Sequence, residues 1–506
     1  MKKCFVLLLT LLVIVGSTAG CTKKEEKPAA PVHNENMPNK LLASQVADFP
    51  VATDTTTYEQ RRQMCLDFFR LSTEFQWKSN IDVEDYVSYY KGTNKGLLTE
   101  NLYAGIPYGG TSSGNIYRWL EYYDETTGIM DLKKAFEENG GWGEGAYVDG
   151  YNKKDGRVIA TRYRSMMALF NQCSSAPGWA WARVINTARF GMTKHTNVYN
   201  GYIPVGCYTY GYEHEGKQYD MTTIDVFGSE TENNPLGYDT KNVIADLKKE
   251  KGPNAMYECY AQMKPGDCLV SGGHQLMVVS VNFFKTSDGK IDYGLSTVTV
   301  GEQMDAWGKR DEINDTKLYQ SGRMDSQYLF SYLEEEKYIP FTFVELLDPA
   351  NEQDKKHLDF YNSYADKLTA VQNSYSKIAF SDEMNGAGIE KGRVYNSLGR
   401  TEGKLSFAEL KEMAVASNYS VSDVFVTVTD KDGNQLLKNI WRSECYHSRE
   451  VPMTATRSTF DKDAQGNLST LCADVEKLAG QGNTIEISLQ IATGEKLTAF
   501  KGELTS

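Results

Sequence analysis

The chain has 506 residues, which is enough for about three domains of ordinary size. Apolar residues make up 41% of it and aromatic residues 12%, so the chain can build real hydrophobic cores. A formal net charge of −13 argues against binding of nucleic acid, or of anionic wall polymers, through bulk charge.

The N-terminus has the layout of an export signal. Two lysines precede an apolar run over residues 5–15, which is too short to span a bilayer. The run leads to Thr18-Ala19-Gly20-Cys21, and small residues directly before a cysteine resemble the lipobox of bacterial lipoproteins. The resemblance implies cleavage before Cys21 and acylation of its sulfur. The alternative is an ordinary signal peptide cut near Ala19.

The residues after the signal are predicted to form a flexible tether over 21–50. This stretch is rich in Lys, Glu, Pro and Asn and poor in large apolar residues up to about residue 40. No later stretch is long and apolar enough for a transmembrane helix. We therefore expect the protein on the extracellular face of the bacterial cytoplasmic membrane, held by a lipid on Cys21.

Hydrophobic spacing predicts the elements that follow. Apolar residues recur with helical period over 56–77, and a buried helix is predicted over 174–190. The Gly-, Tyr- and Asp-rich segment 138–156 is typical of an exposed insertion. From residue 264 onward β-patterns dominate. The runs 276–281 and 293–300 flank a Ser-Asp-Gly turn and predict a hairpin.

A change of pattern near residue 349 predicts a boundary. A charged helix is expected over 352–378, and then short strands separated by Gly/Asp turns, including a hairpin around 430–434. Strands about ten residues apart are typical of an all-β sandwich-like domain. The predicted layout is a signal peptide over 1–20, a tether over 21–50, a main domain over 51–348, a helical linker over 349–391 and an accessory β-sandwich over 392–506.

Cys173 is the candidate nucleophile. It stands just before the predicted helix, with Pro177 in what would be the first turn, where proline is tolerated. A thiolate there faces free backbone N–H groups and the positive end of the helix dipole, which is an activating environment. The alternative is a buried cysteine that only packs at a helix start.

His274 is the candidate base. It follows the Ser271-Gly272-Gly273 turn and opens an apolar strand, so it is held rigidly yet faces a cleft. The other five histidines have no such flanking pattern. A lone histidine at a strand edge is usually structural, but the pairing with a cysteine upstream favours a catalytic role.

These residues carry a resemblance to a known family. Gln172-Cys173 before a Trp-containing helix, Pro265-Gly266-Asp267, and His274 opening an apolar strand are similar to the NlpC/p60 and CHAP cysteine hydrolases of cell walls. The resemblance implies an α+β, papain-like domain, in which the helix bearing the cysteine packs on an antiparallel sheet. It also implies that Glu302 orients the imidazole of His274, with Gln303 as the fallback.

The same resemblance implies three supporting residues. Tyr108, in a Pro-Tyr-Gly element, is expected to line the oxyanion site, and Gln172 and Gln303 are expected to contact oxyanion or substrate. The alternatives are a plain Gly/Pro turn at Tyr108 and a solvated strand-end acid at Glu302. No cofactor is expected, and the cysteines show neither a CxxC pair nor a zinc spacing. Apart from Cys4 and Cys21, seven cysteines remain, so at least one stays unpaired unless it links two molecules.

The expected activity is hydrolysis of peptide or amide bonds of peptidoglycan through a Cys173–His274–Glu302 triad. The family implies this substrate, and the expected partners are therefore peptidoglycan or its peptides and, through the lipid, the membrane. One alternative is an inactive surface lipoprotein that uses the fold to bind, because Ala176-Pro177-Gly178 is an unusual helix start. Another is a cysteine protease or amidase that acts on host or dietary protein.

Overall fold

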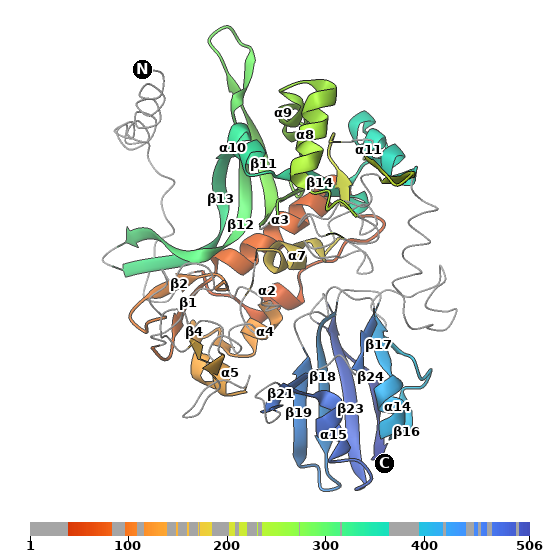
Figure 1. Cartoon of the computed structure of the whole chain (residues 1–506). Helices are drawn as coiled ribbons and strands as arrows, with labels where there is room; N and C mark the ends of the chain where they lie inside the picture. Colours follow the sequence, from red (N-terminus) through yellow and green to blue (C-terminus); the bar gives the residue numbers. More distant parts are fainter. Residues whose placement is uncertain are drawn as a thin grey trace. The chain divides into compact units, whose positions relative to one another are not determined.

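The computed structural model (Figure 1) describes residues 39–82, 97–108, 116–138, 148–149, 159–160, 171, 173–184, 202–207, 212–219, 230, 235–272, 274–313, 316–363, 394–417, 421–441, 450–453, 457–462, 468–491 and 495–506. The predicted lipid site Cys21 and most of the predicted insertion over 138–156 lie outside these residues. No helix within the described ranges is long and apolar enough to cross a membrane.

The N-terminal part of the chain is built on one mixed sheet of ten strands, in the order β3-β4-β1-β2-β13-β12-β11-β10-β14-β7. The part of the sheet from β13 to the edge strand β7 is antiparallel throughout. Strand β2 joins β13 in parallel, and β1 joins β4 in parallel. The predicted hairpin is confirmed, because β11 and β12 pair antiparallel across the 287–289 turn. The strands are β1 Gln76–Ser79, β2 Leu102–Ala104, β3 Tyr123–Asp124, β4 Ile129–Met130, β7 Tyr202–Pro204, β10 Cys268–Val270, β11 Gln275–Lys285, β12 Ile291–Ile313, β13 Thr316–Leu329 and β14 Ile339–Phe343.

Short helices and small hairpins accompany this sheet. The helices are α2 Ala43–Ala47, α3 Tyr58–Glu74, α4 Ile116–Leu120, α5 Leu132–Glu138, α7 Ser175–Trp181, α8 Thr240–Lys251, α9 Ala255–Tyr260, α10 Phe330–Glu335, η6 Val344–Leu346 and α11 Glu352–Asn362. Two small hairpins are formed by β5 Val148–Asp149 with β6 Ile159–Ala160, and by β8 Tyr212–His214 with β9 Lys217–Tyr219.

Helix α3 shows how the sequence sets an element and its packing. The Thr57 side chain accepts from the backbone of Gln60, and the Gln60 side chain accepts in return, which closes a capping box. The helix then lies against glycines of the sheet. A Cβ on Gly301 would come within 2.7 Å of Phe69, and one on Gly322 within 2.7 Å of Thr73. Glycine at both contacts therefore lets α3 approach the β12–β13 pair closely.

The C-terminal part has its own core. A five-stranded sheet in the order β16-β24-β23-β18-β19 and a three-stranded sheet in the order β15-β17-β20 both contribute buried side chains to it. Two short helices contribute as well, and these helices were not part of the predicted all-β sandwich-like domain. Its elements are β15 Val394–Asn396, β16 Glu402–Ser406, α14 Phe407–Glu412, β17 Ala414–Ser417, β18 Val421–Thr429, β19 Gln435–Trp441, β20 Glu450–Pro452, β21 Arg457–Lys462, β22 Leu468–Thr470, α15 Leu471–Glu476, β23 Asn483–Ile491 and β24 Lys496–Thr505.

Two predicted boundaries need correction. Leu41 and Val46 are buried in the N-terminal core, so the tether predicted over 21–50 does not extend through these residues. Helix α11, inside the predicted linker over 349–391, is held to the main domain by an ion pair of 2.7 Å between Lys264 and Asp354. The polar composition of both segments was the only signal that the sequence offered, and it suggested solvent exposure. A few buried side chains nevertheless hold both segments to the domain.

Candidate active site

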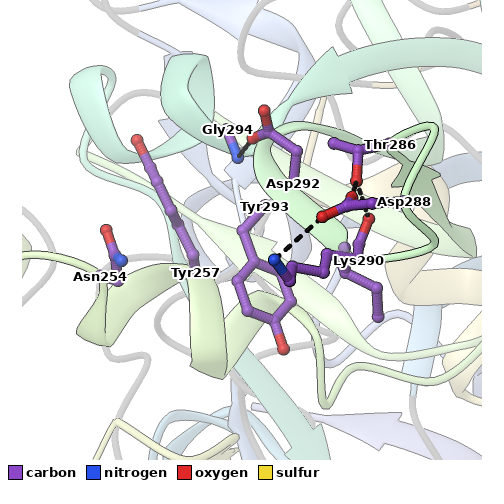
Figure 2. A pocket seen from close by; sticks show the side chains of 9 residues that line it. Asn254, Tyr257, Thr286, Asp288, Lys290, Asp292, Tyr293 and Gly294 are labelled. Atoms are coloured by element: carbon purple, nitrogen blue, oxygen red, sulfur yellow. Dashed lines mark hydrogen bonds and ion pairs between the residues drawn. The ribbon is translucent and has the colours of Figure 1, made fainter.

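The structure contains a cavity of about 500 Å³, and Figure 2 shows the residues that line it. It is lined by Asn254 and Tyr257 at helix α9 and by the tip of the β11–β12 hairpin, where Asp288 and Lys290 form an ion pair of 2.9 Å. None of the three predicted catalytic residues lines it. The candidate site therefore rests on side-chain geometry at the other end of the hairpin.

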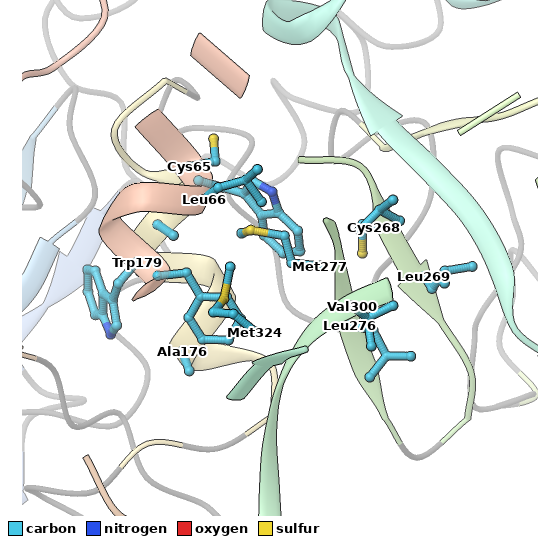
Figure 3. Packing of buried hydrophobic residues seen from close by; sticks show 14 of the residues in the cluster. Cys65, Leu66, Ala176, Trp179, Cys268, Leu269, Leu276, Met277, Val300 and Met324 are labelled. Atoms are coloured by element: carbon cyan, nitrogen blue, oxygen red, sulfur yellow. The ribbon is translucent and has the colours of Figure 1, made fainter. Parts of the chain in front are cut away.

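Cys173 lies just before helix α7 and is half-buried. The helix is shorter than the predicted 174–190, because residues 182–184 already form turns, and Pro177 is accommodated at its third position. Every residue of α7 is buried. Ala176 and Trp179 belong to the same buried cluster as Cys65 and Leu66 of α3 and Val300 of β12, and Figure 3 shows residues of this cluster. The nucleophile candidate thus stands on a rigid, buried support.

The Pro265-Gly266-Asp267 turn joins the helices to the strand that leads to His274. The Trp181 indole of α7 donates to the Gly266 carbonyl at 2.8 Å. Asp267 is 2% exposed and pairs at 2.8 Å with Arg62 of α3, which also donates to the Pro265 carbonyl at 2.7 Å. A charged carboxylate is tolerated in a protein interior when it is paired with an opposite charge and hydrogen-bonded. The turn therefore acts as a junction of α3, α7 and β10.

His274 lies between β10 and β11. The backbone N–H of Ser271 donates to the His274 carbonyl at 3.0 Å, which closes the turn, and Val270 pairs with Gln275 directly behind it. The Nε2 atom of His274 lies 3.3 Å from Oε2 of Glu302. Since Nε2 is engaged there, Nδ1 is the ring nitrogen left for another partner.

Glu302 lies on β12 at a β-bulge and is 1% exposed. A bulge redirects side chains locally. Besides His274, the carboxylate accepts from the Tyr328 hydroxyl of β13, at 3.1 Å to Oε1 and 3.0 Å to Oε2. A buried carboxylate with donors on both oxygens is held in one orientation.

Interactions among these groups shift their ionisation. Burial by itself lowers the pKa of His274, but hydrogen bonds and charges of Cys173 and Glu302 outweigh it and raise the pKa to about 10. Burial raises the pKa of Glu302, yet hydrogen bonds from His274, Ser326 and Tyr328, with the charge of the ring, leave it lowered. The structure thus brings Cys173, His274 and Glu302 into one interacting cluster that favours a protonated imidazole.

The remaining predicted residues fall in different places. Tyr108 is buried and forms an isolated parallel β-bridge with Asn171, while the backbone N–H of Asn171 donates to the Pro107 carbonyl at 2.9 Å. This bridge brings the Pro-Tyr-Gly element beside the segment that leads to Cys173. Gln172 lies outside the described residues.

Gln303 corrects a prediction. Its side chain is fully buried, and its amide donates to the Ile106 carbonyl at 2.9 Å. A predicted contact with oxyanion or substrate needs an exposed side chain, and this one is enclosed, while its fallback role beside His274 stays a prediction. It instead anchors the segment before Tyr108 to β12.

Three residues of the site were missed by sequence reasoning: Arg62, Trp181 and Tyr328. The only signal for Tyr328 was the dominance of β-patterns after residue 264, which predicted neither strand β13 nor its register with β12. No group of three side chains suited to hold a metal ion is present in the described part of the chain.

Comparisons with known proteins found no relative of this chain. No protein-family model, no curated protein and no solved structure matches this chain.

Proposed function

We propose that the protein is a cysteine hydrolase that cleaves peptide or amide bonds of peptidoglycan through Cys173, His274 and Glu302. The observation that carries the proposal is the buried Glu302 carboxylate 3.3 Å from the His274 ring, which in turn interacts with the Cys173 sulfur. Nucleophile, base and orienting acid are the three parts that such catalysis needs. The wall substrate is taken from the motif resemblance.

The proposed reaction is acyl transfer. The Cys173 thiolate attacks the amide carbonyl carbon, a C–S bond forms, and the carbonyl electrons move onto oxygen. Backbone N–H groups near Cys173, with Tyr108 beside them, would hold this oxyanion. The His274 imidazolium protonates the leaving amine as the C–N bond breaks. Water, deprotonated by His274, then releases the acyl group and restores the thiolate.

Glu302 would act on the ring rather than on the substrate. Its negative charge stabilises the imidazolium and fixes the tautomer that presents Nδ1 to the thiol. Tyr328, whose hydroxyl donates to both oxygens of this carboxylate, would be a positioning residue that acts through Glu302.

The finer fold assignment belongs to the same proposal. A papain-like layout needs a cysteine at a helix start, packed on an antiparallel sheet that carries the histidine. Helix α7 packs against α3 and β12, and His274 opens β11 of the antiparallel part of the sheet, which supports that layout.

We also propose that the protein acts outside the cytoplasmic membrane, held by a lipid on Cys21. The lipobox-like sequence supports this, and it would place the site next to the wall. Labelling with a fatty-acid probe, lost in Cys21→Ala, tests the anchor separately from the activity.

Protein beginning at Lys40, incubated with purified peptidoglycan, tests the activity. This start retains Leu41 and Val46, which are part of the core. Wild type is expected to release soluble peptides or sugars bearing new termini, identified by mass spectrometry. Cys173→Ala should release none, while Cys472→Ala, a buried thiol of the C-terminal core, should match wild type.

The same assay separates the alternatives. Binding to walls without turnover by wild type on any wall preparation would support a non-catalytic surface lipoprotein. Cleavage of labelled casein, but not of walls, would support a protease of host or dietary protein.

A further inference from the structure

Arg323 of strand β13 lies beside the proposed catalytic acid. The register of β12 and β13 places it directly opposite Glu302, with Gln303 opposite Gly322 as the next pair. A Cβ on Gly322 would come within 2.7 Å of Thr73 of α3 and within 2.8 Å of the Gln303 amide oxygen, so this pair faces α3. Because neighbouring residues of a strand point to opposite faces, Glu302 and Arg323 share the other face of the sheet.

The side chain of Arg323 carries a charge that the described residues leave without an ion pair. It is half-buried, and across the part of the chain that the structure describes its guanidinium forms neither an ion pair nor a hydrogen bond. By contrast, Arg62 pairs with Asp267 at 2.8 Å, and Arg118 pairs with Glu121. Acidic side chains outnumber basic ones in this protein, 67 to 54. A partly desolvated guanidinium is costly without an opposite charge, so the position is suited to an anion from outside the chain.

The acid opposite Arg323 does not serve as this anion. The Glu302 carboxylate is turned to His274, at 3.3 Å, and to the Tyr328 hydroxyl, at 3.0 Å. Burial and the charge of Glu302 raise the pKa of Tyr328, and the positive charge of Arg323 opposes this rise. The guanidinium therefore lies within electrostatic reach of the hydroxyl that holds the acid, and a group bound by Arg323 would lie close to the proposed triad.

We propose that Arg323 binds a carboxylate of the substrate, so that the preferred substrate is an acidic peptide with a free carboxylate near the bond that is cleaved. The planar guanidinium matches the two oxygens of a carboxylate and donates two parallel hydrogen bonds to them. The inference deepens the proposed hydrolase function and rests on it for the position of the reacting bond. Arg323 would select and orient the substrate without entering the reaction.

Binding to an inactivated protein tests the inference without relying on turnover. The probes are soluble muropeptides, prepared from purified peptidoglycan by digestion of its glycan strands, and the same muropeptides with their carboxylates converted to methylamides. Calorimetry with full-length Cys173→Ala should show that methylamidation weakens binding about 10- to 100-fold, as expected for loss of a charged, hydrogen-bonded contact. Adding Arg323→Gln should make both probes bind alike, at the weaker level, and Arg323→Lys should give an intermediate affinity for the free carboxylates.

A second arginine of the same domain provides the matched control. Arg70 of α3 is exposed and pairs with Asp67 at 3.2 Å, so Arg70→Gln should leave both affinities unchanged. The affinity for the methylamide probe shows whether each variant keeps its fold. Equal affinity of Cys173→Ala for the two probes, or no binding of either, overturns the inference. So does a preference for free carboxylates that survives Arg323→Gln.

Turnover separates this inference from the proposed function. In the active protein, Arg323→Gln should raise KM for the free muropeptides about tenfold, while kcat stays within about twofold of wild type. Binding through Arg323 without cleavage by wild type would remove the hydrolase function and support the carboxylate site. Cleavage with the same KM in wild type and Arg323→Gln would support the hydrolase and overturn the site.

Discussion

The hydroxyl group of Tyr328 donates to both carboxylate oxygens of Glu302, at 3.1 Å and 3.0 Å. The same carboxylate lies 3.3 Å from His274, so a phenol on β13 fixes the acid on β12, which in turn orients the imidazole at the start of β11. Strand β13, strand β12 and the turn before β11 thus each contribute one group to a single series of contacts.

Tyr328→Phe should weaken this series of contacts without removing a reacting group. Because the hydrogen bonds reach a charged partner, we expect kcat on peptidoglycan fragments to fall about tenfold with KM unchanged. The control is Tyr332→Phe, whose ring stacks on Tyr328 and which should retain full activity. Equal kcat in Tyr328→Phe and wild type would show that the phenol only packs.

Glu302→Gln should be more severe. The amide keeps the shape but cannot stabilise the imidazolium, so we expect turnover to drop by about 10²- to 10⁴-fold while the fold survives. The pKa of His274, followed by NMR, should fall from its raised value of about 10, because one of the causes of the shift is removed. Unchanged turnover would contradict the orienting role.

The raised pKa of His274 predicts a pH dependence of stability. A group whose pKa is higher in the folded state stabilises the fold fully below its unfolded pKa, about 6.5, and loses this contribution as pH rises through about 10. Wild type should therefore lose more unfolding free energy between pH 7 and pH 10 than His274→Gln does. Urea denaturation of both proteins across this range measures the difference, and parallel curves would contradict the shift.

The Arg62–Asp267 pair should be among the costliest polar contacts to break. Asp267→Ala leaves a buried guanidinium without its carboxylate, and we expect a loss of about 3–5 kcal/mol in unfolding free energy. Asp288→Ala breaks an exposed pair with Lys290 and should cost less than about 1 kcal/mol. Chemical denaturation of the two variants provides the comparison, and equal losses would show that the junction is not built on this pair.

The sequence predicted the α+β class through the family resemblance, helix α3 through its hydrophobic period, and the β11–β12 hairpin through its apolar runs and turn. It also singled out Cys173 before a helix and His274 at a strand start, whereas Glu302 came from the family resemblance alone. Such features depend on residues a few positions apart, where periodicity and turn chemistry are strong signals.

Only the tertiary structure decided the Tyr328–Glu302 contact, the Arg62–Asp267 junction, the enclosed Gln303 and the burial of Leu41. Each depends on strand register or on partners far apart in the chain. Hydrophobic patterning shows that a side chain is suited to burial, but not which distant group it will meet, because that is settled when the whole core packs.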